Sequence, residues 1–129
     1  MRGTVVDASA VAAVLFDEPE AAPVAASVRG RLLAPTLLRY ELASVATTRL
    51  IRHPHQARSI QQRYELLDRL DLHWFEPDWH ALPGLARRWS LSAYDAAYLQ
   101  LALARDAALI TLDARLAAAW DDAVASGRV

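Results

Sequence analysis

Four acidic residues interrupt apolar stretches of the sequence and are the side chains best suited to chemistry. Asp7 follows the β-branched run Thr4-Val5-Val6, and Asp113 comes just after Leu109-Ile110-Thr111. Glu41 and Asp95 each lie near the start of a stretch that predicts a helix with a buried face. A carboxylate in apolar surroundings is costly unless it has a partner. The arrangement therefore suggests a shared site rather than four unrelated surface charges.

The sequence offers no obvious arginine partner for each of these acids. Arg39 and Arg115 lie two residues from Glu41 and Asp113, a spacing that points side chains on a helix in different directions. Two carboxylates 4 Å apart repel by ~4 kcal/mol at an effective dielectric constant of about 20. Converging acids would need a cation, and oxygen ligands favour Mg²⁺ or Mn²⁺. Such an ion polarises a phosphoryl oxygen and lowers the pKa of bound water, which suits phosphodiester hydrolysis.

Each acid also has a simpler structural explanation. Asp113 could cap a helix, Asp95 could be a first-turn acid favoured by the helix dipole, Asp7 could accept bonds from turn amides, and Glu41 could pair with an arginine. Any one of these acids alone is weak support for a site. The joint pattern is what predicts one.

Strand-like and helix-like segments alternate along the chain. Short β-branched or aromatic runs predict strands, and longer stretches with an apolar face predict helices. The expected strands are Thr4–Val6, Arg31–Ala34, Leu72–Phe75 and Ala108–Thr111, and the expected helices are Ser9–Asp17, Glu20–Val28, Thr36–Ile51, Gln56–Leu70, Asp78–Trp89, Ala93–Arg105 and Asp113–Trp120. This alternation favours an α/β fold with a parallel sheet covered on both faces. The carboxyl ends of parallel strands form one edge, so Asp7 and Asp113 should meet there.

Several boundary residues carry expectations of their own. Pro35 suits the first position of the long helix, because its missing N–H would have no partner there. Ser9, Asp78 and Ser92 are expected as helix caps. The Ser9 hydroxyl could also reach a metal-bound water.

The composition describes one ordinary globular domain over residues 1–129. Hydrophobic residues make up 54%, the net charge is −1, and no apolar run approaches the ~18 residues of a membrane span. The chain has no Cys, which excludes thiolate chemistry, and all 14 basic residues are Arg, which excludes a P-loop lysine or Schiff base. A cytoplasmic location is expected.

Four segments resemble the motifs of the PIN-domain family, and more narrowly of VapC-type toxin ribonucleases. They are Val5-Val6-Asp7-Ala8-Ser9-Ala10, Tyr40-Glu41-Leu42-Ala43-Ser44-Val45, Ser92-Ala93-Tyr94-Asp95-Ala96-Ala97-Tyr98-Leu99 and Ile110-Thr111-Leu112-Asp113-Ala114-Arg115-Leu116. The resemblance spans nearly the whole chain in both order and spacing. The segment around Asp95 is the most specific of the four.

The resemblance implies a three-layer α/β/α sandwich with four or five short, mostly parallel strands. It implies that Asp7, Glu41, Asp95 and Asp113 bind Mg²⁺ or Mn²⁺ and cut RNA, leaving 5′-phosphate and 3′-hydroxyl ends. Ser9, Thr111 and Arg115 would then position substrate or water. It also implies a homodimer held inactive by a VapB-type antitoxin.

Two features depart from the family pattern. Some members carry a further acid, for which only Asp121 or Asp122 could serve here. The last strand would be a stub near Arg128-Val129 or missing.

The stretch between Glu41 and Glu65 contains no acid and four arginines. Arg49 and Arg52 in it are candidate phosphate contacts, and a solvated helix face is the alternative. Without the four site acids the remaining charge is +3, so net charge does not oppose an RNA substrate. The four tryptophans are expected to fill the core or an interface rather than to stack on bases.

The sequence thus predicts a Mg²⁺-dependent endoribonuclease, the toxin of a toxin–antitoxin pair. The alternatives are a catalytically silent module that acts through protein contacts, a housekeeping RNA-processing nuclease, and, less favoured without lysine, a phosphotransfer domain. Replacing Asp95 by Asn should abolish cleavage and leave folding intact. Replacing Asp7 by Ala should stabilise the metal-free protein by relieving repulsion.

Overall fold

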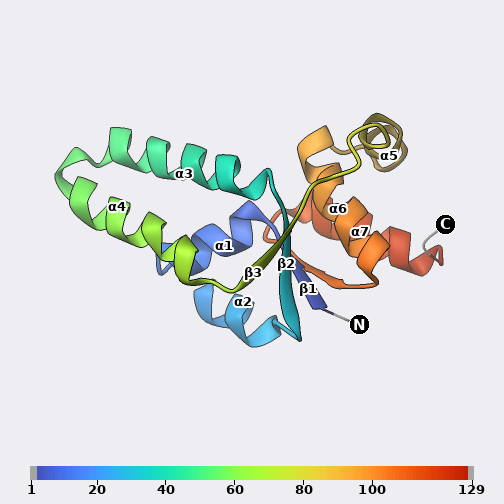
Figure 1. Cartoon of the computed structure of the whole chain (residues 1–129), viewed down its shortest axis with the longest axis horizontal. Coiled ribbons are helices and arrows are strands. Elements are labelled where there is room, and N and C mark those ends of the chain that lie inside the picture. The colour runs from blue at the N-terminus through green and yellow to red at the C-terminus, as the bar shows by residue number, and fades with distance from the viewer. Residues whose placement is uncertain (1–2, 128–129) are drawn as a thin grey trace.

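The four expected strands form a single parallel sheet in the computed structural model, which describes residues 3–127 (Figure 1). The strands are β1 (Gly3–Val6), β2 (Arg31–Pro35), β3 (Leu72–Phe75) and β4 (Ala108–Ile110). Their order across the sheet is β3-β2-β1-β4. The first strand therefore lies between β2 and β4, with Val5 opposite both Leu33 and Leu109.

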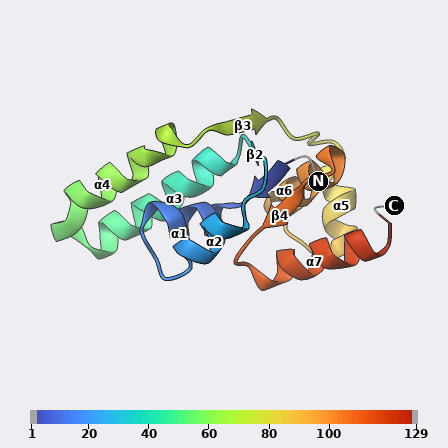
Figure 2. The same ribbon diagram turned by 90° about the horizontal axis from the view of Figure 1, so that it is seen from below.

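Helices cover both faces of this sheet (Figures 1 and 2). One face carries α1 (Ala8–Leu15), α2 (Ala21–Ser27), α3 (Leu38–Arg52) and α4 (Ala57–Glu65), with the 3₁₀ turns η1 (Pro54–Gln56) and η2 (Leu66–Arg69). The other face carries α5 (Leu82–Trp89), α6 (Ala93–Arg105) and α7 (Ala114–Ala125). The expected three-layer α/β/α sandwich with a parallel central sheet is confirmed. Both views show α3 and α4 side by side as a hairpin that extends beyond the sheet.

The core lies between β1 and the helices on either side of it. All four residues of β1 are buried, as expected for a central strand covered on both faces. Leu38 and Leu42 of α3 are fully buried, one turn apart on the face that packs inward. Leu99 of α6 is fully buried as well, and α6 packs against β1, β2, β4, α5 and α7. Helix α6 is almost wholly apolar because so much of its surface is covered.

Three boundary expectations are wrong. Pro35 is the last residue of β2 rather than the first of the helix. It is tolerated there because β2 pairs with β1 only as far as Leu33, so no donor is needed toward β1 at Pro35. Ser9 lies inside α1, and Asp7 is the capping residue. Asp78 does not cap α5, which begins four residues later after Ala81.

The strand order places a topological switch point between β1 and β4. The chain moves outward from β1 to β2 and β3 and then returns to the opposite side of β1 as β4. In open α/β sheets, ligands bind beyond the carboxyl ends of the strands at such a point. Asp7 and Thr111 come directly after β1 and β4, at this position.

Two remaining expectations concern the ends and the membrane. The possible strand at Arg128-Val129 lies outside the described residues. No helix within residues 3–127 has the length and apolar character to cross a bilayer.

Candidate active site

Asp7 is a buried carboxylate at the carboxyl end of β1, only 4% exposed. Its Oδ1 accepts a hydrogen bond from the Ala10 backbone N–H at 3.0 Å and caps α1. The Ser9 hydroxyl donates to the same oxygen at 2.7 Å, and the Thr111 hydroxyl donates to Oδ2. Three donors therefore fix the position of the Asp7 carboxylate.

Ser9 and Thr111 join the start of α1 to the β4–α7 loop, although they are 102 residues apart in the sequence. The Ser9 hydroxyl accepts a hydrogen bond from the Leu112 N–H at 2.9 Å, and the Thr111 hydroxyl accepts one from the Asp113 N–H at 2.9 Å. Both hydroxyls thus use their protons on Asp7 and their lone pairs on the β4–α7 loop. These residues fix the position of Asp7 relative to Asp113.

Glu41 lies in the first turn of α3 and is half-buried. The Tyr98 hydroxyl, from α6, donates to Glu41 Oε1 at 2.5 Å. Burial raises the pKa of Glu41, the hydrogen bond from Tyr98 opposes the rise, and the charges of Asp95 and Asp7 add to it. Burial and the same carboxylate also raise the pKa of Tyr98, which therefore remains a proton donor.

Asp95 lies in the first turn of α6, on the other face of the sheet from α3. The Ser92 side chain caps this helix by accepting from the Asp95 N–H at 3.1 Å, as expected. Burial raises the pKa of the Asp95 carboxyl, and the charges of Asp113 and Asp7 raise it further, while Ser92 and Arg115 act in the opposite direction.

Asp113 is exposed and caps α7 by accepting from the Leu116 N–H at 3.0 Å. Arg115 is exposed on the first turn of α7, close enough to Asp95 for its charge to lower the pKa of that carboxyl. No ion pair within residues 3–127 joins an arginine to any of the four acids. The four acids therefore interact with one another across one edge of the sheet without separate neutralisation.

The donor chemistry of this edge fits a hard divalent cation, because every polar side-chain atom of the four acids is a carboxylate oxygen. No three His, Asp or Glu side chains in the described part of the chain are arranged to hold one ion together. Their present partners are known: Asp7 accepts from two hydroxyls, Glu41 accepts from Tyr98, and Asp113 accepts from its own helix. Binding of a cation would require these side chains to exchange hydrogen bonds for metal bonds.

The two arginines predicted to contact phosphate differ from each other. Arg49 forms an ion pair with Glu18 at 2.6 Å and stacks over the Phe16 ring at 4.3 Å. Its guanidinium joins α3 to the loop after α1, and its contact with an RNA phosphate stays a prediction. Arg52 is exposed. Together with Arg49 it lines a depression on the surface of α3.

The candidates for a further acid lie away from the other four. Asp121 and Asp122 are exposed on α7, eight and nine residues after Asp113. That separation is about 12 Å along a helix axis. Neither acid perturbs the pKa of Glu41 or Asp95.

Tyr98 is the site residue that had no role in the sequence-based prediction. It is 1% exposed, and its hydroxyl reaches Glu41 across the sheet edge. The sequence could have identified Tyr98 through its position three residues after Asp95, because that spacing places both side chains on one side of α6. A phenol hydroxyl needs a polar partner when it is buried.

The raised pKa of Glu41 predicts a pH-dependent stability difference between the parent chain and Glu41→Gln. A carboxyl whose folded-state pKa is raised favours folding below its unfolded pKa of about 4.3 and loses that contribution as the pH rises. Gln keeps an acceptor for Tyr98 and never ionises. We expect metal-free Glu41→Gln to gain stability relative to the parent between pH 4 and pH 7, measured by urea unfolding. A constant difference across this range would contradict the prediction.

Comparison with known proteins gives the same fold. The family model described as "PIN domain" matches residues 4–120 of the chain. Among solved structures, the chain is similar to PAE2754 from Pyrobaculum aerophilum, with a TM-score of 0.74 and 21% sequence identity. The match covers 92% of this chain and 84% of that one. No curated protein matches significantly.

PIN domains are generally nucleases and typically bind divalent metals. The family match includes all four acids, and the solved structure shares the sheet-and-helix arrangement described above. The chain therefore belongs to the PIN domain family.

Proposed function

We propose that the protein is a metal-dependent endoribonuclease that hydrolyses RNA phosphodiester bonds. The observation that carries the proposal is the convergence of Asp7, Glu41, Asp95 and Asp113 at the switch point of a PIN-domain sheet without arginine partners in the described residues. Raised pKa values from mutual repulsion and burial are typical of catalytic sites.

Asp7 and Asp95 are proposed as the main ligands of Mg²⁺, for which Mn²⁺ could substitute. Asp113 completes the site directly or through water. A bound cation would polarise the phosphoryl oxygen and lower the pKa of a bound water. Glu41 either binds the cation or orients the attacking water, and its raised pKa suits a group that accepts a proton.

Ser9, Thr111 and Tyr98 are proposed as positioning residues. Ser9 orients the Asp7 carboxylate from the first turn of α1, Thr111 orients it from the β4–α7 loop, and Tyr98 orients Glu41 from α6. Arg115 lies on the same edge, where its positive charge could meet a substrate phosphate.

The experiment that tests the proposal combines cleavage with thermal unfolding. We expect cleavage of single-stranded RNA in Mg²⁺ and its loss in EDTA. We also expect Mn²⁺ to raise the melting temperature, since an ion at 100 times its dissociation constant stabilises by about 2.7 kcal/mol. Absence of both effects would refute a metal-dependent nuclease.

A silent binding module is the second candidate, and one observation favours it. The carboxylates within residues 3–127 are not arranged to hold an ion in their present conformation. A silent module would act through protein contacts alone and show no Mn²⁺-linked stabilisation. The titration above separates the two candidates.

We expect different outcomes when Arg49 and Arg52 are each replaced by Ala. Arg49→Ala removes an ion pair and a cation–π contact, so we expect a loss of about 1–2 kcal/mol in stability. Arg52→Ala should leave stability within about 0.5 kcal/mol. If Arg52 contacts a phosphate, its loss makes the slope of log binding constant against log salt concentration shallower by about one. Urea unfolding and filter binding at several salt concentrations measure the two effects.

The finer role that we propose is the toxin of a type II toxin–antitoxin pair. The support is the resemblance of the four acidic motifs to VapC-type ribonucleases. A homodimer, a VapB-type antitoxin partner and a cytoplasmic location belong to the same proposal. A small neighbouring reading frame with a DNA-binding N-terminus, whose product blocks cleavage, would support it over a housekeeping RNA-processing role.

A further inference from the structure

Three aromatic side chains are exposed in segments that either adjoin an acid in the sequence or follow a strand at the carboxyl edge of the sheet, although aromatic rings of this size normally bury much of their surface. Tyr40 is 77% exposed, and Trp79 and Tyr94 are each 66% exposed. Tyr40 precedes Glu41 in the first turn of α3, and Tyr94 precedes Asp95 in the first turn of α6. Trp79 was expected to fill the core or an interface, but in the single chain its side chain is exposed.

Trp79 belongs to the same edge of the sheet as the acids. It lies in the loop that follows β3, four residues after the strand ends. That loop is bonded to the segment before α3 at Glu76, whose carboxylate accepts from the Thr36 hydroxyl at 2.8 Å. It is bonded to α6 at Asp78 through Gln100.

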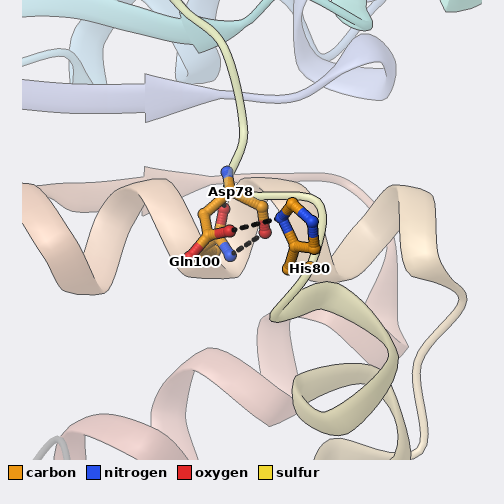
Figure 3. A network of polar contacts seen from close by, with 3 residues as sticks. All are labelled: Asp78, His80 and Gln100. Atoms are coloured by element: carbon orange, nitrogen blue, oxygen red, sulfur yellow. Dashed lines mark hydrogen bonds and ion pairs between the residues drawn. The ribbon is translucent and has the colours of Figure 1, made fainter.

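The Trp79 loop is held in place by its neighbours (Figure 3). The Gln100 side-chain amide accepts from the Asp78 N–H and donates to the Asp78 carbonyl, both at 3.0 Å. On the other side of Trp79, the His80 ring stacks on the indole, with 3.9 Å between centroids and 22° between planes. His80 Nδ1 also lies 3.9 Å from Asp78 Oδ1. A ring fixed in this way loses little conformational entropy when a flat ligand stacks on it.

We propose that Trp79, extended by His80, is a stacking platform for an unpaired base of RNA bound at the acidic site, with Tyr40 and Tyr94 as further contacts. This inference rests on the proposed nuclease function and adds a binding position for one base outside the acids. Base stacking on exposed aromatic rings is the usual means by which proteins hold single strands. The carboxylates Glu76 and Asp78 beside Trp79 make a phosphate contact unfavourable there. Stacking, in contrast, needs no charge.

Two variants test the platform. Trp79→Ala removes the ring, and Trp79→Phe keeps a smaller one. Val124→Ala serves as control, because Val124 is an exposed apolar residue near the far end of α7. Binding is measured with fluorescein-labelled 8-mer single-stranded RNA in Mg²⁺, in chains that also carry Asp95→Asn to prevent cleavage. A hairpin RNA with all bases paired is the comparison probe.

We expect Trp79→Ala to weaken single-strand binding about 10-fold, Trp79→Phe about threefold, and Val124→Ala not at all. The salt dependence of binding should stay the same, since the indole carries no charge, and affinity for the hairpin should not change. In the chain with Asp95 intact, Trp79→Ala should raise the RNA concentration for half-maximal cleavage and leave the maximal rate within twofold.

The outcomes separate this inference from the proposed function. If the parent chain cleaves RNA and Trp79→Ala binds the single strand as tightly as its parent, the platform is wrong and the nuclease stands. If Trp79→Ala weakens binding and no RNA is cleaved in Mg²⁺ or Mn²⁺, the platform stands and the nuclease is wrong. If Trp79→Ala changes only the oligomeric state in sedimentation, the ring is a protein interface and the platform is wrong.

Discussion

Replacing Asp95 by Asn is expected to lower the rate of RNA cleavage at least ~10³-fold, which corresponds to about 4 kcal/mol on the barrier. Asn keeps the shape of the side chain and removes the negative charge that a divalent cation requires. The fold should be unaffected, because Ser92 caps α6 through the Asp95 backbone N–H and not through the carboxylate. The metal-free variant should be at least as stable as the parent, since Asp113 and Asp7 repel the Asp95 charge.

The matched control is Asp121→Asn, the same chemical change on an exposed acid of α7. It should cleave RNA at the parent rate and melt at the parent temperature. Initial rates on a labelled RNA in Mg²⁺, with melting curves in EDTA, give both readouts. Cleavage by Asp95→Asn at a rate near that of the parent would refute the assignment of Asp95.

Replacing Asp7 by Ala is expected to destabilise the metal-free protein by about 2–3 kcal/mol, or roughly 10 °C in melting temperature. The variant loses the α1 cap and leaves the hydroxyls of Ser9 and Thr111 without their acceptor. These losses exceed the relief of repulsion with Glu41 and Asp95, which are only half-buried. The structure thus reverses the sequence-based expectation that Asp7→Ala would stabilise the metal-free chain.

Asp7→Asn separates the two roles of Asp7. Its amide oxygen can still accept from Ala10 and Ser9, so we expect it to lose less than half of the stability that Asp7→Ala loses. Both variants should lose RNA cleavage. Melting of metal-free Asp7→Ala at or above the parent temperature would show that charge repulsion outweighs the hydrogen bonds of Asp7.

The sequence was sufficient to predict the sheet and the position of the four acids. Strand β1 is a short β-branched run, and α6 is apolar on nearly every side, so their types followed from local composition. The convergence of Asp7 and Asp113 followed from the rule that parallel strands end at one edge. Burial raises the pKa of both Glu41 and Asp95, the charge of Asp7 adds to both rises, and the charge of Asp113 adds to that of Asp95.

What the sequence could not supply were partners that only the tertiary structure brings together. Tyr98 is 57 residues from Glu41, and Glu18 is 31 residues from Arg49. Local rules gave Ser9 a capping role because serine favours that position, but Asp7, two residues earlier, is the cap. The exposure of Trp79 is also a tertiary property, set by the anchoring of its loop on Gln100.

The central position of β1 has a consequence for protein synthesis. The Asp7 carboxylate reaches its native environment only when Thr111 arrives beside it, 104 residues later in the chain. Strand β4 is also needed to cover one side of β1. A nascent chain on the ribosome therefore cannot assemble its acidic centre until β4 and Thr111 have been translated.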